Sequence, residues 1–306
     1  MQMSIANLQK ALRDARGNPD KIAQIIGALM STGQGRKIVA ASLKNPLKKS
    51  VEMESHLRKG LHHDPLAQGE TPEYEKDVQA YAYVVQKQGG LPVRHAEGDD
   101  FLIANTFDIV AYKSYKLSDI AKKKFDLPAR TKERIKHRIV QTENKTLFAL
   151  FRSVVADAAY PHVAVASAGG LTPEALSESF SQVVQGDPAE GENHAAYVWV
   201  NPREMADIRT FGRDIFDFET QRELLQSGIM GNIWGAQVIQ NNLVPVGTVF
   251  VTCTPELLGR CPERVALSVL PADDLKFARV GFLGYENIGA FIHNPFGISV
   301  VSVSRP

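Results

Sequence analysis

Few residues in this chain have the types and the spacing that catalysis or ligand binding requires. The run Ser31-Thr32-Gly33-Gln34-Gly35-Arg36-Lys37 is similar to a phosphate-binding loop. It lacks the GxxxxGK[ST] spacing of that loop, however, and it does not follow a strand pattern. We therefore interpret it as an interruption between two helical segments and not as a nucleotide site.

The adjacent residues His62, His63 and Asp64 are of the types that bind metal ions. Neighbouring residues do not share a face of a helix or strand, and no third ligand is spaced nearby. We interpret them as a loop with polar surface histidines. The remaining candidates lack a nucleophile motif or an identifiable partner: Ser153, Ser167, Ser177, Ser179, His162, His194 and the pair Asp273-Asp274, which we interpret as a turn.

Trp234 stands among glycines, close to Gly231 and Gly235. An aromatic ring in such a setting can stack on a ligand, but the simpler interpretation is a buried packing anchor. The sequence indicates no catalytic, metal-binding or cofactor-binding residue, and we expect no cofactor. The chain is therefore predicted not to be an enzyme.

Cys253 and Cys261 are the two cysteines of the chain. Two cysteines form neither a disulfide framework nor a zinc site, so we expect buried or ordinary thiols. A crosslink between subunits outside the reducing cytoplasm stays open as an alternative.

The composition is that of a globular protein, with 306 residues, 44% hydrophobic and 23% charged. The apolar stretches are too short for a membrane span, and the N-terminal residues lack the apolar core of a secretory signal. We expect synthesis in the cytoplasm and no membrane contact.

A net charge of +1 hides two basic segments. Residues 1–60 contain 11 Lys or Arg against 4 Asp or Glu, and residues 111–140 contain 10 against 3. Three interpretations stay open: solvated helix faces, charge pairing between subunits, or an inner surface that tolerates a polyanion. Neither segment has the interleaved aromatic residues of a dedicated nucleic-acid reader.

Apolar periodicity predicts a mixture of helices and strands. Residues 1–60 are helical with breaks, residues 131–158 form the best helix with Thr131 as N-cap, and a second helix follows the N-cap Thr172 and ends near residue 185. Extended runs predict strands at residues 101–115 and 195–201, a strand and loop at 265–274, and strands within residues 219–251 after a helix. Residues 61–100 are predicted to be a protruding hairpin arm with its turn at Gly89-Gly90. The last 26 residues are predicted to form a strand, a turn at Asn294-Pro295 and a second strand.

Three segments resemble tailed-phage major capsid proteins of the Hong Kong phage type, a fold shared with encapsulin nanocompartments. They are Asn193 to Arg209, Leu224 to Thr252 and Gly284 to Val303, and the order of the elements also agrees from end to end. The resemblance implies an α+β fold with five parts. These are an N-terminal arm (1–60), an extended loop (61–100), a peripheral domain with a spine helix (101–202), an axial domain (203–275) and return strands of the peripheral domain (276–306). Whether the N-terminal arm is a scaffold-like segment stays open.

The same resemblance implies a major capsid protein that assembles into an icosahedral shell around double-stranded DNA. Its partners would be further copies in pentamers and hexamers, DNA held by non-specific contact and, as an open point, scaffold, portal and cement proteins. It would be assembled in the host cytoplasm and reside in the virion. The residues expected to matter for assembly are Gln68 to Asp100, Gly228 to Gly235 and the helix Thr131 to Ala158.

Two other functions stay open at this point. One is an encapsulin-like compartment that holds an enzyme cargo, and the other is a soluble α+β enzyme with an unrecognised site.

Some capsids of the resembled family also crosslink a loop lysine to an asparagine of a neighbour. Lys76 or Lys87 with Asn294 would be the corresponding residues, although nothing in their spacing makes this bond specific.

Overall fold

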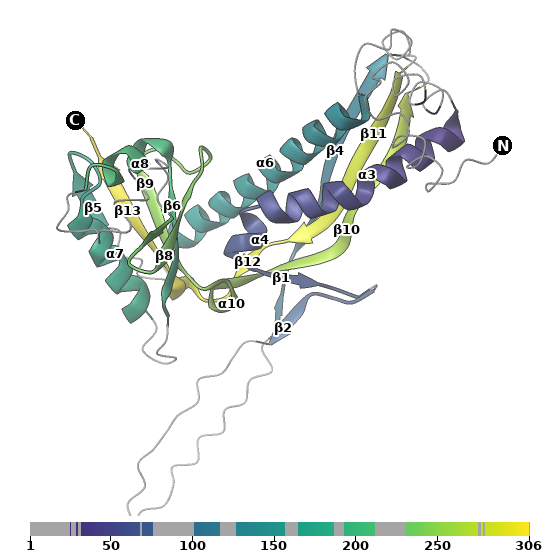
Figure 1. The fold of residues 1–306 in the computed structure, drawn as a ribbon. Coiled ribbons are helices and arrows are strands. Elements are labelled where there is room, and N and C mark those ends of the chain that lie inside the picture. The colour runs from purple at the N-terminus through teal and green to yellow at the C-terminus, as the bar shows by residue number, and fades with distance from the viewer. Residues whose placement is uncertain are drawn as a thin grey trace, which may run out of the picture.

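Two β-sheets divide the chain into two units that a long helix joins (Figure 1). The computed structural model describes residues 25, 29, 32–67, 69–75, 101–116, 127–156, 165–186, 193–211, 231–274, 277 and 279–305. The predicted loop turn at Gly89-Gly90 and most of residues 61–100 lie outside this set. Strand β2 (Glu73–Glu75) pairs with β3 (Phe101–Ile103) at the two ends of that segment.

The first unit is built on a five-stranded sheet of long, mostly antiparallel strands. Its order is β1 (His62–Pro65), β10 (Gly259–Asp274), β11 (Arg279–Gly289) and β4 (Thr106–Lys116), and β12 (Phe291–Ile292) also pairs with β10. The β11–β4 ladder runs without a register shift from Arg279 opposite Lys116 to Gly289 opposite Thr106. The β10–β11 ladder has register irregularities between Glu263 and Ser268.

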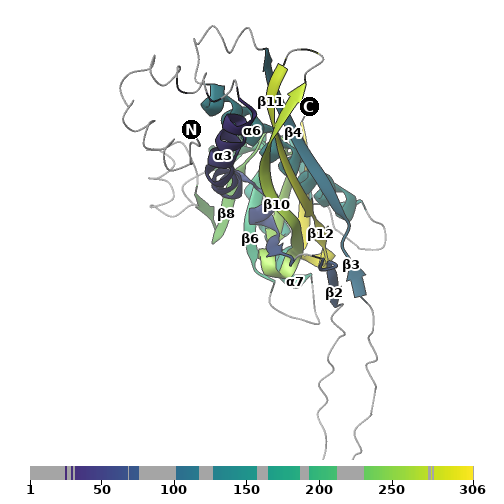
Figure 2. The same cartoon turned by 90° about the vertical axis from the view of Figure 1, so that its right-hand side faces the viewer.

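Three helices belong to this unit, and two of them cover one face of its sheet. They are α3 (Gly33–Glu54), α4 (Leu57–Gly60) and α6 (Leu127–Val155). The view turned by 90° shows α3 and α6 on the same side of β10, β11 and β4 (Figure 2). Buried apolar residues at helical spacing, such as Ile135 and Ile139, turn this side of α6 toward the sheet. The chain has a glycine at the contact, since a Cβ atom on Gly284 would lie 2.6 Å from Ile135 Cγ2.

The second unit is built on a six-stranded sheet. Its order is β5 (Val165–Ala168), β13 (Ile298–Ser304), β9 (Thr248–Cys253), β6 (Ala195–Val200), β8 (Ala236–Gln240) and β7 (Asn232–Ile233). The accompanying helices are α7 (Pro173–Gln185), α8 (Pro202–Ile208), α10 (Pro255–Leu258) and the short 3₁₀ turn η2 (Pro295–Gly297). Hydrophobic residues of β9 and β13 are buried almost throughout, as expected for central strands.

The end of α6 connects the two units through an aromatic cluster. Trp199 on β6 is fully buried and contacts Phe148 and Phe151 of α6, with ring centroids 5.9 and 6.1 Å away. The Trp199 indole Nε1 donates a hydrogen bond to Thr252 Oγ1 at 3.1 Å, so its polar atom is satisfied inside the core. The hydrophobic core is therefore continuous from one unit to the other.

The start of α7 was predicted correctly, since Thr172 is its N-cap and precedes Pro173. Thr172 Oγ1 accepts a hydrogen bond from Ala175 N, and Asn201 caps α8 in the same way through Arg203 N. The prediction of Thr131 as the N-cap of the longest helix is wrong. The helix begins at Leu127, and the buried Thr131 hydroxyl donates to the Tyr115 hydroxyl instead.

The strands of each sheet do not fall within single predicted domain ranges. Strands β5 and β6 lie in the six-stranded sheet although they precede residue 203, and β10 lies in the five-stranded sheet although all of it precedes residue 276. Strands β11 and β13, predicted to lie together, also belong to different sheets. The chain crosses between the units repeatedly, because each strand is placed by partners that are distant in sequence.

Candidate functional site

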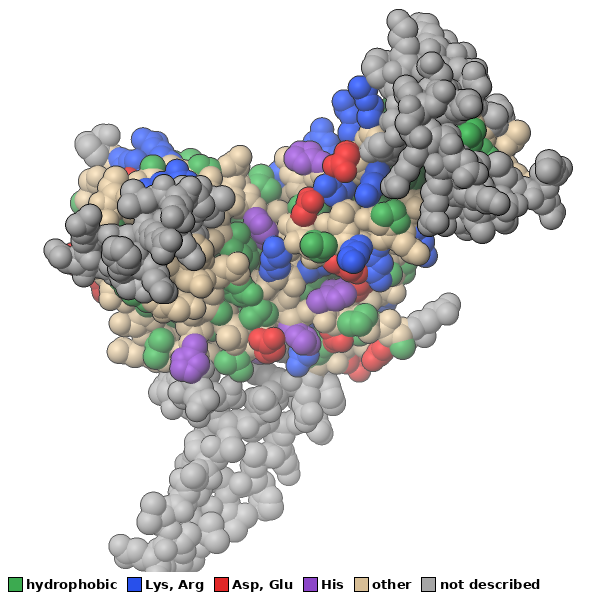
Figure 3. Space-filling view, viewed as in Figure 1, with side chains coloured by type: hydrophobic (Ala, Val, Ile, Leu, Met, Phe, Trp, Pro, Cys, Tyr) green, Lys and Arg blue, Asp and Glu red, His purple; other side chains and the backbone are tan. Residues whose placement is uncertain are grey.

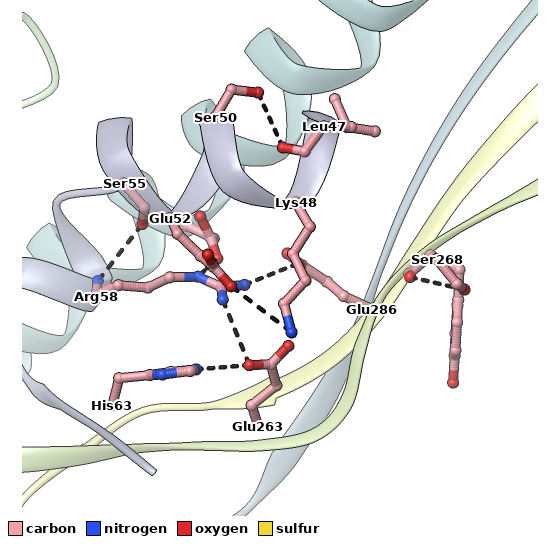
Figure 4. Close-up of polar contacts among 12 residues, drawn as sticks. Leu47, Lys48, Ser50, Glu52, Ser55, Arg58, His63, Glu263, Ser268 and Glu286 are labelled. Atoms are coloured by element: carbon pink, nitrogen blue, oxygen red, sulfur yellow. Dashed lines mark hydrogen bonds and ion pairs between the residues drawn. The ribbon is translucent and has the colours of Figure 1, made fainter. Parts of the chain in front are cut away.

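One guanidinium group lies among three carboxylates in the interior of the five-stranded unit (Figure 4). Arg58 Nε is 2.9 Å from Glu143 Oε1, Arg58 Nη2 is 3.0 Å from Glu286 Oε2, and Arg58 Nη1 is 3.5 Å from Glu263 Oε2. All four side chains are buried. We call these four residues the Arg58 cluster.

Four different elements supply the Arg58 cluster. Arg58 comes from α4, Glu143 from the middle of α6, Glu263 from β10 beside its register irregularity, and Glu286 from β11. The cluster therefore joins α4 and α6 to both central strands of the sheet. Buried, hydrogen-bonded ion pairs fix the relative position of the elements that supply them, because separation would leave a charge without its partner.

The charges of the Arg58 cluster do not balance if every group is ionised. Burial raises the pKa of Glu286 to about 8, and the neighbouring Glu143 adds to this rise. Burial also raises the pKa of Glu143, although Arg58 opposes the shift. A proton held by Glu286 can be donated to Glu143, which reduces the repulsion between the two carboxylates. The raised pKa of Glu286 therefore predicts that the cluster holds a proton at neutral pH.

Glu263 behaves in the opposite way because it has more positive neighbours. Burial alone would raise its pKa, but His63, Arg58 and Lys48 outweigh burial and lower it. His63 Nε2 lies 2.6 Å from Glu263 Oε2. The predicted surface loop at His62, His63 and Asp64 is wrong, since these residues form β1, parallel to β10, and His63 reaches the edge of the cluster.

A histidine at the boundary between the two units holds them together by hydrogen bonds. The His56 backbone N–H donates to Asn144 Oδ1 at 2.8 Å, and His56 Nδ1 lies 2.6 Å from Asn241 Nδ2, so that this ring nitrogen accepts. The His56 ring also lies 5.7 Å from the Trp199 ring. Burial, followed by the charge of Lys59, lowers the pKa of His56 to about 4, so the ring is neutral at physiological pH.

Trp234 is exposed, and its prediction as a buried packing anchor is wrong. Its side chain is 46% exposed at the two-residue turn between β7 and β8 and contacts the Phe180 ring edge-on at 5.3 Å. Both turn residues have positive φ angles, 47° for Trp234 and 88° for Gly235, as a type I′ turn requires. This left-handed region is unfavourable for a bulky residue such as tryptophan. The buried tryptophan of the chain is Trp199.

The two cysteines, the pair Asp273-Asp274 and the glycine run after Thr32 all have structural roles in the fold. Cys253 and Cys261 are buried and free, as expected, and burial raises the pKa of both thiols, that of Cys253 to about 12. The supposed turn Asp273-Asp274 is wrong, because both residues belong to β10 and Asp273 pairs with Arg36 at 2.7 Å. Thr32 caps α3 by accepting from Gly35 N, so the glycine run is a helix start.

Several predicted residues lie apart from one another or outside the described set. Asn294 caps η2 and its Nδ2 donates to Asn193 Oδ1 at 3.3 Å. Lys76, Lys87, Gln68, His162 and Gly228 lie outside the described residues. No group of side chains suited to a metal ion occurs among the residues that the structure describes. Within the same set, no helix has both the length and the apolarity needed to cross a membrane.

Sequence reasoning missed the Arg58 cluster, although one signal was present. Glu143 falls four residues after Ile139 and four before Leu147, on the apolar side of α6, where a carboxylate needs a buried partner. Glu286 similarly falls two residues before Ile288 on the buried side of β11. The partner Arg58 could not be identified, because it lies 228 residues from Glu286 in the chain.

The fold has counterparts among solved phage capsids, although comparisons of sequence found no match. No protein-family model and no curated protein matches the chain. The mature capsid protein of bacteriophage PhiM1 superposes with a TM-score of 0.57 at 10% identity, covering 82% of this chain and 88% of that one. The capsid of the native GTA particle gives 0.59 at 13% identity (82% and 90%), and Mycobacterium phage Che8 gives 0.54 at 14% (76% and 85%).

These superpositions cover 76–82% of the chain. Identities of 10–14% establish a shared architecture and not a shared activity. The chain therefore has the Hong Kong phage-type fold of tailed-phage capsid proteins, as the resemblance in its sequence implied.

Proposed function

We propose that this chain is the major capsid protein of a tailed phage and forms an icosahedral shell around double-stranded DNA. The observation that carries the proposal is the superposition of 82% of the chain on capsid subunits of the same architecture. A structural role also agrees with the site, since the Arg58 cluster joins four elements and is closed by its own ion pairs. The chain acts as a building block and not as a catalyst.

An exposed apolar surface on the five-stranded unit supports contact between copies. Val110 and Tyr112 of β4 and Leu270 of β10 are 55%, 48% and 50% exposed. The ladders place Leu283 between Tyr112 and Leu270, so these side chains continue across three strands on the face opposite α3 and α6. A monomer that stays in solution rarely exposes such a patch, whereas a shell subunit buries it against neighbours.

The two sheets suggest a domain assignment for the proposed shell. We assign the five-stranded unit with α3 and α6 to the peripheral domain, with α6 as its spine, and the six-stranded unit to the axial domain. The extended loop lies within residues 61–100, after β1, and residues before α3 belong to the N-terminal arm. Pentamers and hexamers of the chain assemble in the host cytoplasm and become part of the virion, with scaffold, portal and cement proteins as further partners.

The test is expression of the full chain alone, followed by negative-stain electron microscopy and measurement of nucleic acid in the purified particles. Regular polyhedral shells are the expected result. Shells that enclose protein cargo and exclude nucleic acid would replace the phage function by that of a compartment. Small oligomers that stay small after addition of a scaffold from the same genome would contradict a shell function altogether.

A further inference from the structure

The helices in the described parts of the two basic segments meet on one side of the five-stranded unit. Residues 33–54 form α3 and residues 127–155 form α6, and the two helices lie beside each other on the same face of the sheet. Figure 3, in the orientation of Figure 1, shows Lys and Arg side chains over this region, with some carboxylates between them. The long-range pairing of the helices thus places charges together that are about a hundred residues apart in the chain.

The cations follow a regular spacing along α6. Arg134, Arg138, Lys145 and Arg152 are exposed and are separated by four, seven and seven residues, which places them along one side of the helix. At about 1.5 Å per residue this stripe is about 27 Å long. On α3, Lys37 and Lys44 are exposed seven residues apart and also share a side. We call these six residues the cationic stripes.

Few carboxylates near the cationic stripes neutralise them. The exposed Glu54 and Glu133 both pair with Lys136, at 3.0 and 3.1 Å, and Glu52 pairs with Lys48 at 3.7 Å. Within the part of the chain that the structure describes, no residue of the cationic stripes forms an ion pair. Their charges are therefore available to a partner.

The surroundings of the cationic stripes favour a polyanion over a protein surface. Protein interfaces have an apolar centre from which lysine is depleted. Among the described residues, Met53 is the one large apolar side chain that α3 and α6 expose, whereas the opposite face of the sheet exposes Val110, Tyr112 and Leu270. Rows of lysine and arginine without apolar anchors match the phosphate backbone of a duplex, whose negative charges are spaced about 1.7 Å apart along its axis.

We propose that the cationic stripes of α3 and α6 contact the phosphate backbone of the double-stranded nucleic acid enclosed by the shell. This inference rests on the proposed shell function and adds the orientation of the subunit: the helix side faces the interior, and the apolar sheet side contacts neighbouring protein. No exposed aromatic residue interrupts the described stripes, so binding is independent of base sequence and depends strongly on salt.

The test compares two triple variants of the full chain that lose the same charge. The first is Arg134→Gln, Arg138→Gln and Lys145→Gln on α6. The matched control is Lys116→Gln, Arg264→Gln and Arg279→Gln, three exposed cations on the strands. Binding of a fluorescent DNA duplex is measured over a range of salt concentrations, and electron microscopy and nucleic-acid content are recorded for each preparation.

The expected result is a difference between the variants in the salt dependence of binding. Each lost phosphate contact lowers the slope of log K against log salt by about 0.9, so the α6 variant loses about 2.7 and the control changes little. Shells of the α6 variant also contain less nucleic acid. Equal effects of both variants would overturn the inference, as would folded α6 variants that bind DNA normally but form no shells, since the stripe would then be a contact between subunits. Absence of shells from the unmodified chain counts against the proposed function alone, because duplex binding is measured independently.

Discussion

Arg58 Nη2 and Glu286 Oε2 lie 3.0 Å apart in the interior, and the same guanidinium also contacts Glu143 and Glu263. One cation thus compensates several carboxylates that come from a helix and two strands. Removing the cation leaves negative charges close together in a medium of low dielectric constant, which is more unfavourable than losing one exposed ion pair.

Replacement of Arg58 by methionine is therefore expected to destabilise the subunit strongly. Arg58→Met should lower the free energy of unfolding by about 3–5 kcal/mol, the range seen when one partner of a buried ion pair is removed. Urea-induced unfolding followed by circular dichroism measures the change. The matched control is Lys59→Met on the adjacent exposed position, which should change stability by less than about 0.5 kcal/mol. Equal stability of the two variants would show that Arg58 does not stabilise the fold by compensating the buried carboxylates.

The proton bound by the Arg58 cluster predicts a loss of stability as the pH rises from about 4.5 to about 8. The pKa of Glu286 is raised from 4.5 to about 8 in the folded chain, so its contribution is complete below pH 4.5 and is lost as pH rises through about 8. The free energy of unfolding should fall by up to about 1.4 kcal/mol per pH unit in this window. Glu263, whose pKa is lowered, has the opposite effect and weakens the fold on acidification below 4.5.

Glu286→Gln tests this assignment because glutamine resembles the protonated carboxyl. The variant should match the stability of the unmodified chain near pH 4.5 and show a much flatter decline between about pH 4.5 and 8, measured as unfolding midpoints across the pH series. The exposed Glu256→Gln variant serves as control and should decline like the unmodified chain. A decline in Glu286→Gln as steep as that of the control would assign the proton to another group.

The exposed turn at Trp234 is expected to serve assembly and not folding. Trp234→Ala removes one aromatic contact with Phe180, worth about 0.5–1.5 kcal/mol, and should leave a folded, soluble subunit. Because about half of Trp234 is exposed to a neighbouring subunit's approach, its loss should prevent regular shells, as seen by electron microscopy. Trp234→Phe keeps an aromatic ring and should retain assembly. Regular shells from Trp234→Ala would show that this turn is not needed for contacts between subunits.

The close approach of α6 to β11 predicts a specific coupling between two residues. A Cβ atom on Gly284 would lie 2.6 Å from Ile135 Cγ2, so Gly284→Ala should cost about 1–3 kcal/mol through overpacking. Adding Ile135→Ala removes the obstructing methyl group, and the double variant should be more stable than the sum of the single effects by about 0.5–3 kcal/mol. Gly33→Ala, where the nearest atom is 3.8 Å away, is the control and should be tolerated. Additive effects would place Ile135 away from this contact.

Local features were predictable from the sequence where short-range physics determines them. Thr172 and Asn201 cap their helices next to proline, and the apolar spacing of Ile135 and Ile139 identified α6. The resemblance to phage capsid proteins rested on strand and turn patterns of the same local kind, and the superpositions confirm the fold that it implied. The start of α6 was placed four residues late, because a threonine that resembles an N-cap is instead buried against Tyr115.

Only the tertiary structure decided which distant residues meet. Strands close in sequence lie in different sheets, Trp234 is exposed while Trp199 is buried, and the two basic segments converge on one side through α3 and α6. The Arg58 cluster is the clearest case, since its partners are 85 to 228 residues from Arg58. The sequence by itself determined local features such as the N-cap Thr172 and the apolar face of α6, because periodicity and capping act over a few residues. It did not determine the buried charges and the exposed surfaces, because these depend on contacts that form only when the whole chain packs.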